Sequence, residues 1–335
     1  MPGAGSAADA GSMGRTEFAG PGRPLRFIRA PPTLRRTAAI PAGAMSLQVL
    51  RGQAAGPESA PLPRSVTRLE PSRGWVALRL DDVWGYRELL WFLALRDIKV
   101  RYKQTVLGLS WAVLQPVGTA LVFTVVFGRL AHIPSDGVPY AVFALAGLVP
   151  WTFFASAVST TALSLVGNTN LISKVYFPRL CVPIATVLAS FVDLLVASVV
   201  LFAAMAVYGV GAGARILLVL PFMLLAFAAA LGAGLWLSAI AARYRDVRHA
   251  VPFLLQFWLF ATPVAYPSSL LAERWHMLYA INPMVGVVEG FRWSLLGSHV
   301  GIGSLALTSA TSAAVLLVTG ALYFRRMERS FADVI

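Results

Sequence analysis

Long uncharged, apolar stretches are the feature that most limits what this chain can fold into. Residues 106–128 contain no Asp, Glu, Lys or Arg, and neither does the stretch between Asp136 and Lys174. Roughly 20 apolar residues in a helix cover the hydrocarbon core of a bilayer, which is about 30 Å thick. Since 57% of the residues are hydrophobic and only 13% are charged, the chain has too little polar surface for a soluble domain. The sequence predicts an all-α integral membrane protein.

The N-terminal region has a different composition. Pro, Gly and scattered Arg are frequent in residues 1–74, and the apolar residues there show no period, so we predict a disordered tail followed by a transmembrane domain at residues 75–335. The Arg-rich, acid-poor start could equally be a transit peptide, and Met13 or Met45 could be the start of translation. No signal-type apolar segment precedes residue 89, so no secretory cleavage is expected.

A basic segment leads into the first uncharged stretch. If residues 90–103 are helical, they form an apolar stripe and a neighbouring basic stripe. The apolar stripe consists of Trp91, Leu95, Ile98 and Tyr102, and the basic stripe of Arg96, Lys99 and Lys103. We therefore predict an amphipathic interfacial helix that contacts membrane lipid. Because cations are retained on the cytoplasmic side, these residues and Arg101 place this end inside the cell. For each cation, the alternative is that it only fixes topology and contacts lipid headgroups.

Six transmembrane helices are predicted, at residues 106–128, 140–166, 180–208, 216–242, 251–266 and 302–324. Residues 268–299 contain two apolar pieces divided by Asn282-Pro283. Non-helical backbone at membrane depth requires surrounding protein or a water-filled cavity, so we predict external re-entrant helices before the last span. Most Lys and Arg residues of the membrane domain fall in the segments assigned to the inside. Both termini are therefore expected to be cytoplasmic in a multi-pass protein of the cytoplasmic (inner) membrane.

Several kinds of chemistry are missing from the sequence. None of the three lysines, Lys99, Lys103 and Lys174, follows a glycine, so there is no phosphate-binding P-loop. Cys181 stands alone and the 4 His residues lack ligand-like spacing, so we expect no metal site. The net charge of +13 lies in the tail and short loops, which predicts no nucleic-acid partner. The chain is therefore expected to bind no cofactor and to work without covalent catalysis, rather than as an enzyme.

Several motifs occur in an order that resembles a known family. They read YRELLWFLALRDIKVRYKQTVLGLSWAVLQP, PYAVFALAGLVPWTFF, NTNLISKVYFPR, ARYRDVRH, TPVAYP and NPMVGVVEGFRWSLLG. From about residue 75 to 331 the chain resembles ABC-2 type permeases that export polysaccharides such as O-antigen or teichoic acid. The resemblance implies a homodimer with two separate ATP-binding-cassette subunits, which hold ATP and Mg. It also implies a channel at the dimer interface and undecaprenyl-linked polysaccharide as the substrate.

Aromatic side chains near the span ends are candidates for the channel, because rings can stack on sugars while a glycan slides past. The candidates are Tyr140, Phe143, Trp151, Phe153, Phe154, Phe257, Trp258, Phe260 and Tyr266. Each ring could instead belong to an interfacial belt or to the core. Asn282, Glu289 and Arg292 are candidates for an external gate, although the i, i+3 spacing of Glu289 and Arg292 also suits a simple local pair.

Contact with the ATPase subunits is expected from two internal elements: the interfacial helix and the short segment 168–179, where the resemblance places a coupling helix. The candidate coupling residues are Arg96, Lys99, Arg101, Lys103, Asn170, Lys174, Tyr176, Phe177 and Arg179. Pro178 is expected to end the short helix. Asp193, a carboxylate within the third span, suggests either proton coupling or a structural role, and we favour the structural role because ATP drives the transport.

Two other functions fit parts of this pattern. One is an ABC-2 permease for a small drug or lipid, with the same fold and a narrower channel. The other is a polytopic membrane enzyme of glycan assembly. Such enzymes usually have large external loops with several carboxylates, whereas only residues 268–299 form a sizeable external segment here. A neighbouring gene that encodes P-loop and signature motifs would favour the exporter.

Overall fold

The computed structural model describes residues 80–103, 110–211, 213–270, 272–298, 302–328 and 331. The predicted tail, the beginning of the first predicted span at residues 106–109, and Arg329 lie outside these ranges. In the described part of the chain all regular structure is helical, which agrees with the predicted all-α class.

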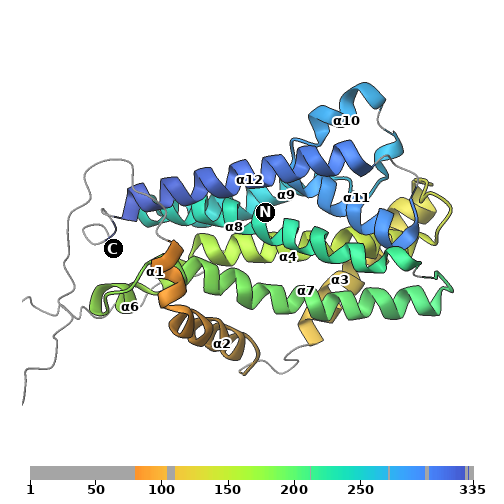
Figure 1. Cartoon of the computed structure of the whole chain (residues 1–335). Helices are drawn as coiled ribbons and strands as arrows, with labels where there is room; N and C mark the ends of the chain where they lie inside the picture. Colours follow the sequence, from red (N-terminus) through yellow and green to blue (C-terminus); the bar gives the residue numbers. More distant parts are fainter. Residues whose placement is uncertain are drawn as a thin grey trace, which may run out of the picture. The chain divides into compact units, whose positions relative to one another are not determined.

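The helices follow one another in an order that Figure 1 labels in part. They are α1 (Leu80–Gly85), α2 (Arg87–Lys103), α3 (Ser110–Phe123), η1 (Thr124–Leu130), α4 (Tyr140–Ala162), α5 (Ser164–Gly167), α6 (Thr169–Lys174), α7 (Cys181–Val207), η2 (Ala214–Leu218), α8 (Val219–Arg243), α9 (Val247–Phe260), η3 (Ser268–Leu270), α10 (Glu273–Tyr279), α11 (Pro283–Leu296) and α12 (Ile302–Met327).

Five stretches are helical, apolar and long enough to cross a membrane. They are Ser110–Leu130, Tyr140–Ala162, Cys181–Val207, Arg215–Arg243 and Ile302–Met327. In the first stretch the π-helix η1 continues α3, and in the fourth the 3₁₀-helix η2 runs into α8. These stretches match five of the six predicted spans closely, because a span is set by the local run of apolar residues.

The predicted fifth span, residues 251–266, is not a continuous helix. α9 has 14 residues, which corresponds to about 21 Å and falls short of the roughly 30 Å of hydrocarbon. Pro263 and Pro267 cannot donate a backbone hydrogen bond, so the helix does not continue through them. The structure thus has five helices of spanning length among its described residues, and a shorter sixth element followed by α10 and α11.

The α2 helix does not have the predicted division into an apolar and a basic face. Trp91, Phe92 and Val100 are exposed on its outer side. The side that packs on α7 contains Leu93 and Ala94 but also charged residues, described below. This arrangement suits a helix whose outer side faces lipid and whose polar groups find partners within the protein.

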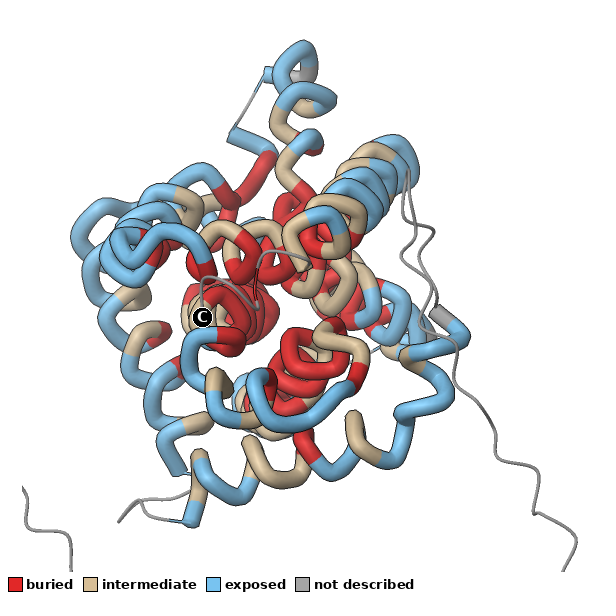
Figure 2. Tube along the Cα trace, turned by 90° about the vertical axis from the view of Figure 1, so that its left-hand side faces the viewer, coloured by how far each residue is buried: buried red, intermediate tan, exposed pale blue. Residues whose placement is uncertain are grey.

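The α4 helix lies at the centre of the bundle. It packs against α7, α8 and α11, and 78% of its spanning window is buried. Figure 2 shows the buried segments gathered in the middle and the exposed segments around them. α8 and α12 approach closely at Gly232, where a Cβ would lie 2.7 Å from the backbone nitrogen of Leu317 in α12.

The two ends of the bundle are distinct in Figure 1. The helices α1 and α6 lie at one end, together with the last turn of α12, and we call this the α6 end. The helices α10 and α11 lie at the opposite end, which we call the α10 end.

Candidate functional site

A buried ion pair organises the α10 end. Glu289 and Arg292 lie one turn apart on α11, each side chain is 2% exposed, and Arg292 Nη1 donates to Glu289 Oε1 at 3.2 Å. The Arg292 guanidinium also lies over the Phe143 ring of α4, with 3.6 Å between Cζ and the ring centroid. The i, i+3 pair expected from the sequence is therefore confirmed as a contact within one helix.

The same arginine holds the non-helical backbone that follows α9. Arg292 Nη1 donates to the carbonyl oxygens of Pro263 at 2.5 Å and Tyr266 at 3.3 Å, and Nη2 donates to that of Val264 at 2.7 Å. A Cβ at Gly147 would lie 2.9 Å from Arg292 Nη2, so the glycine leaves room for the guanidinium. Arg292 therefore binds carbonyl groups of the backbone that follows α9, where no helical N–H group is available to them.

Asn282 fixes the same segment from the start of α11. Its side-chain oxygen accepts from Met284 N at 3.0 Å, which caps the helix, and from Trp258 Nε1 at 2.9 Å. Its Nδ2 donates to Ala261 O at 3.0 Å and to Thr262 Oγ1 at 2.9 Å. Of the three residues predicted as an external gate, Asn282 and Arg292 thus converge on residues 261–266, from the N-cap and the third turn of α11, and Glu289 pairs with Arg292.

Two tyrosines link α10 to this segment. The hydroxyl groups of Tyr266 and Tyr279 lie 2.6 Å apart. Burial of the Tyr279 phenol, reinforced by its hydrogen bond with Tyr266, raises the pKa of Tyr279 above its ordinary value. The Tyr279 phenol therefore stays protonated at physiological pH.

The aromatic residues predicted for the channel fall into two groups. All those on α4 are buried inside the subunit, namely Tyr140, Phe143, Trp151, Phe153 and Phe154. They pack in the core because α4 is surrounded by other helices. Phe257 and Phe260 are 61% and 60% exposed on α9. Trp258 connects the two groups, since its ring lies 4.9 Å from that of Phe154. Among the rings predicted for the channel, Phe257 and Phe260 of α9 are therefore the exposed ones.

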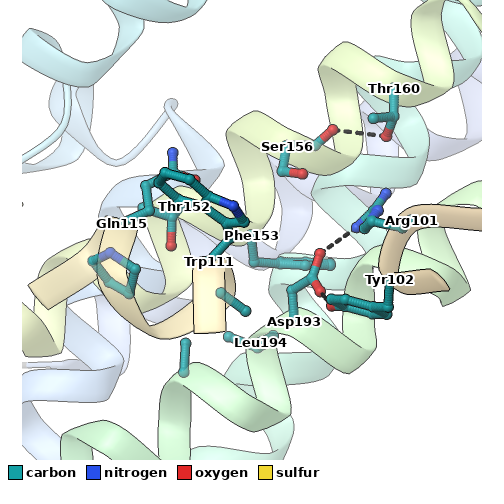
Figure 3. Close-up of a pocket in the computed structure, with 13 residues that line it drawn as sticks. Arg101, Tyr102, Trp111, Gln115, Thr152, Phe153, Ser156, Thr160, Asp193 and Leu194 are labelled. Carbon is teal, nitrogen blue, oxygen red and sulfur yellow. Dashed lines mark hydrogen bonds and ion pairs between the residues drawn. The ribbon is translucent and has the colours of Figure 1, made fainter. Parts of the chain in front are cut away.

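A polar cavity opens among α2, α3, α4 and α7. It has a volume of about 310 Å³, and Figure 3 shows the side chains that line it. Its polar and aromatic lining residues include Arg101, Tyr102, Trp111, Gln115, Thr152, Ser156, Thr160 and Asp193. These eight residues were absent from the set predicted for the channel. The signal that could have revealed them is the spacing of Thr152, Ser156 and Thr160, which places three hydroxyl groups on one face of an otherwise apolar span.

Asp193 lies close to the middle of α7 at the edge of this cavity. It pairs with Arg101 and accepts a hydrogen bond from Tyr102, and Arg101 Nη2 also donates to Ser190 Oγ at 3.2 Å. Figure 3 shows the carboxylate between the Arg101 and Tyr102 side chains. Arg101 and Tyr102 of α2 are therefore the partners of Asp193 in the structural role that was predicted for it, and Arg101 brings a cation to the carboxylate.

The cations of α2 point in different directions. Lys99 and Lys103 are exposed, whereas Arg96 and Arg101 are half-buried against the bundle. Arg96 Nη2 donates to Asp97 Oδ1 at 2.7 Å and to Asn168 Oδ1 at 2.8 Å. Asn168 begins the segment predicted to contact the ATPase subunits, so Arg96 connects α2 to that segment within the chain.

The predicted coupling residues at the α6 end also divide by exposure. Asn170, Lys174 and Tyr176 are exposed, and the Tyr176 side chain is 78% exposed. Phe177 is 5% exposed and packs in a core cluster with residues of α7, α8 and α12. Phe177 therefore anchors the segment to its own subunit, and the exposed ring available to a partner is that of Tyr176. Arg179 contacts the end of α12, as described below.

The described part of the chain contains no group of three or more His, Cys, Asp or Glu residues that could hold a metal ion. Its polar clusters consist of ion pairs, hydroxyl groups and backbone carbonyls, which position helices and can contact a polar solute.

Comparison with known proteins identifies the family. The chain is 24% identical over 262 residues to the O-antigen export system permease protein RfbA of Klebsiella pneumoniae, an alignment that covers 78% of this chain and 100% of the relative. It is 27% identical over 256 residues to RfbA of Myxococcus xanthus, covering 76% and 98% of the two chains. It is also 27% identical over 243 residues to the polysialic acid transport protein KpsM of Escherichia coli, covering 70% and 92%. Residues 88–296 match the ABC-2 type transporter family, and the chain belongs to that family.

Proposed function

We propose that this protein is the membrane-spanning permease subunit of an ATP-driven exporter of lipid-linked polysaccharide, such as O-antigen. The observation that carries this proposal is the similarity to O-antigen export permeases, which extends over 98% to 100% of their length. The subunit acts as a homodimer with two ATP-binding-cassette subunits, which bind ATP and Mg. Undecaprenyl-linked polysaccharide is the substrate.

The proposed topology places the protein in the inner membrane with the α6 end and both termini in the cytoplasm. It requires one more crossing between α8 and α12 than the helices of spanning length provide. α9 and residues 261–267 together supply this crossing. The contacts of Arg292 and Asn282 support it, because they satisfy carbonyl groups of a non-helical segment inside the protein. Burial within protein is a setting in which such a segment is tolerated at membrane depth. α10 and α11 then form the external gate.

The proposed glycan path runs along two surfaces of the subunit. One is the cavity lined by Trp111, Gln115 and the hydroxyl groups of α4, which offer an aromatic ring and hydrogen-bonding groups. The other is the exposed aromatic side of α9, with Phe257 and Phe260. A second copy of the chain supplies the opposite wall. Sugars present both hydroxyl groups and apolar C–H faces, which match this mixture of side chains.

The proposed contact with the ATPase subunits lies at the exposed side of the α6 segment. Tyr176 is an exposed aromatic residue of a type that is enriched among residues that dominate interfaces, and Lys174 adds an exposed cation two positions before it. Lys99 and Lys103 of α2 form a second exposed basic surface. Phe177 holds the segment in position from within.

The test is to locate the glycan after depletion of this protein in the source strain. We expect lipid-linked glycan to accumulate on the cytoplasmic face and surface labelling of the glycan to fall. Re-expression of the chain should restore the label. Undiminished surface glycan in a strain without a redundant exporter would overturn the proposal. Loss of glycan synthesis inside the cell would instead support an enzyme of glycan assembly.

A further inference from the structure

Arg179 joins the α6 segment to the last turn of the bundle. It follows Pro178, directly before α7, and its contacts are made with Glu328, the residue that follows α12. The Arg179 backbone N–H donates to Glu328 Oε1 at 3.2 Å, and Arg179 Nη1 donates to the Glu328 backbone oxygen at 2.5 Å. Arg325 Nη1 donates to the second carboxylate oxygen, Glu328 Oε2, at 3.1 Å. We call these contacts the Arg179–Glu328 latch.

The latch is largely withdrawn from solvent. The side chains of Arg325 and Glu328 are 12% and 19% exposed. The Arg179 guanidinium lies over the Phe331 ring at 5.9 Å, and Phe331 packs edge-on against Phe324 with 5.4 Å between the ring centroids. Hydrogen bonds to charged groups in such a site are stronger than those at an open surface.

The apolar core beneath the latch connects the same two elements. Ile172 and Phe177 of the α6 segment belong to one buried cluster with Phe324 and Phe331. Polar and apolar contacts therefore both tie this segment to the end of α12. The segment is also tied to α2 at its other end, through Arg96 and Asn168.

α12 has little freedom to slide on its neighbour. A Cβ at Gly320 would lie 2.6 Å from the backbone oxygen of Gly232 in α8, and a Cβ at Gly232 would lie 2.7 Å from Leu317 N. Helices that approach backbone to backbone at two facing glycines move together, because interfaces packed this closely do not deform continuously. A displacement of Arg179 that reaches α12 is therefore passed on to α8.

We propose that Glu328 is a positioning residue that transmits movement of the α6 segment to the α8–α12 pair during transport. This inference rests on the proposed function, since it assigns a route from the site of ATPase contact to the helices beside the crossing. The latch acts through three linked contacts: the Arg179 amide, the Arg179 guanidinium and the Arg325 side chain.

The test uses the full chain assembled with its ATPase subunit in proteoliposomes, with undecaprenyl-linked glycan from the source strain as the probe. We expect Glu328→Ala to lower the glycan exported per ATP hydrolysed by roughly tenfold, the scale expected when hydrogen bonds to a charged group are lost. ATP hydrolysis and recovery of the assembled complex should stay at the wild-type level. Arg326→Ala is the matched control, since Arg326 is exposed on the same turn of α12.

Two further variants separate transmission from simple stability. Glu328→Gln keeps an oxygen that accepts from the Arg179 amide, so it should recover most of the export efficiency. Arg179→Ala combined with Glu328→Ala should lose more efficiency than either single variant, because the two remove different hydrogen bonds of the latch. Arg179→Ala removes the bond from the guanidinium to the Glu328 backbone oxygen, and Glu328→Ala removes the carboxylate bonds to the Arg179 amide and to Arg325. If Glu328→Ala fails to assemble, Arg179→Ala and Glu328→Gln carry the comparison.

Two outcomes would overturn the inference: wild-type export per ATP hydrolysed in Arg179→Ala and Glu328→Ala, or losses that follow thermal stability alone and match those of a core variant of equal stability. Failure of the wild-type complex to export any glycan would contradict the proposed function itself. The two failures are therefore distinguishable.

Discussion

At the scale of single residues, burial separates side chains that the sequence places together. Tyr176 and Phe177 are adjacent aromatics in one short segment, yet the first is exposed and the second is enclosed by residues from other helices. The sequence predicted both as contacts for the ATPase subunits. The direction of each ring depends on the extended backbone at Val175, after which Phe177 turns inward.

The two aromatics should respond differently to truncation. We expect Phe177→Ala to lower the free energy of unfolding by about 3–5 kcal/mol, because it removes a buried ring. Tyr176→Ala should leave stability nearly unchanged and reduce transport-linked ATP hydrolysis. Thermal unfolding of the purified subunit, together with ATPase assays of the assembled complex, measures both effects. Equal stability of the two variants would contradict this assignment.

At the scale of elements, the region between α8 and α12 differs most from its prediction. Apolar residues continue to Tyr266, but the helix ends at Phe260 and the next residues are held by Arg292 and Asn282. The sequence identified the prolines and the polar residues of this region. It could not show that the polar residues would bind the carbonyl groups beside the prolines.

Cysteine accessibility tests the proposed crossing by α9 and residues 261–267. In a Cys181→Ser background, Arg245→Cys lies between α8 and α9, and Trp275→Cys lies on α10. We expect an impermeant thiol reagent added outside intact cells to label Trp275→Cys but to reach Arg245→Cys only after the cells are opened. Labelling of both positions from the same side would show that no crossing occurs between them.

At the scale of the whole molecule, the subunit has an apolar centre and its polar cavity lies toward one side. α4 contributes buried rings to the centre and hydroxyl groups to the cavity. The exposed Phe257 and Phe260 lie on another helix, α9. Such an arrangement suits a path that is completed by a second subunit, since the described helices fill their centre with buried rings and the cavity opens beside them.

Paired ring substitutions test where the glycan path runs. We expect Phe257→Ala to slow glycan export while stability stays nearly unchanged, because its ring is exposed. Phe154→Ala should instead destabilise the subunit by about 3–5 kcal/mol, since that ring is fully buried. Export assays in proteoliposomes and thermal unfolding make the comparison. Wild-type export in Phe257→Ala would remove the α9 rings from the path.

The sequence by itself determined the membrane class, the limits of five long helices and the lack of a P-loop. These properties depend on neighbouring residues, because hydrocarbon selects local apolar runs and a phosphate-binding loop is a local motif. Only the tertiary structure decided that Arg101 pairs with Asp193, 92 positions away, and that Arg179 contacts Glu328, 149 positions away. Only the tertiary structure placed α4 at the centre of the bundle, which buries the aromatic rings of α4. Such contacts depend on which helices become neighbours, and several helix arrangements can bury the same apolar runs.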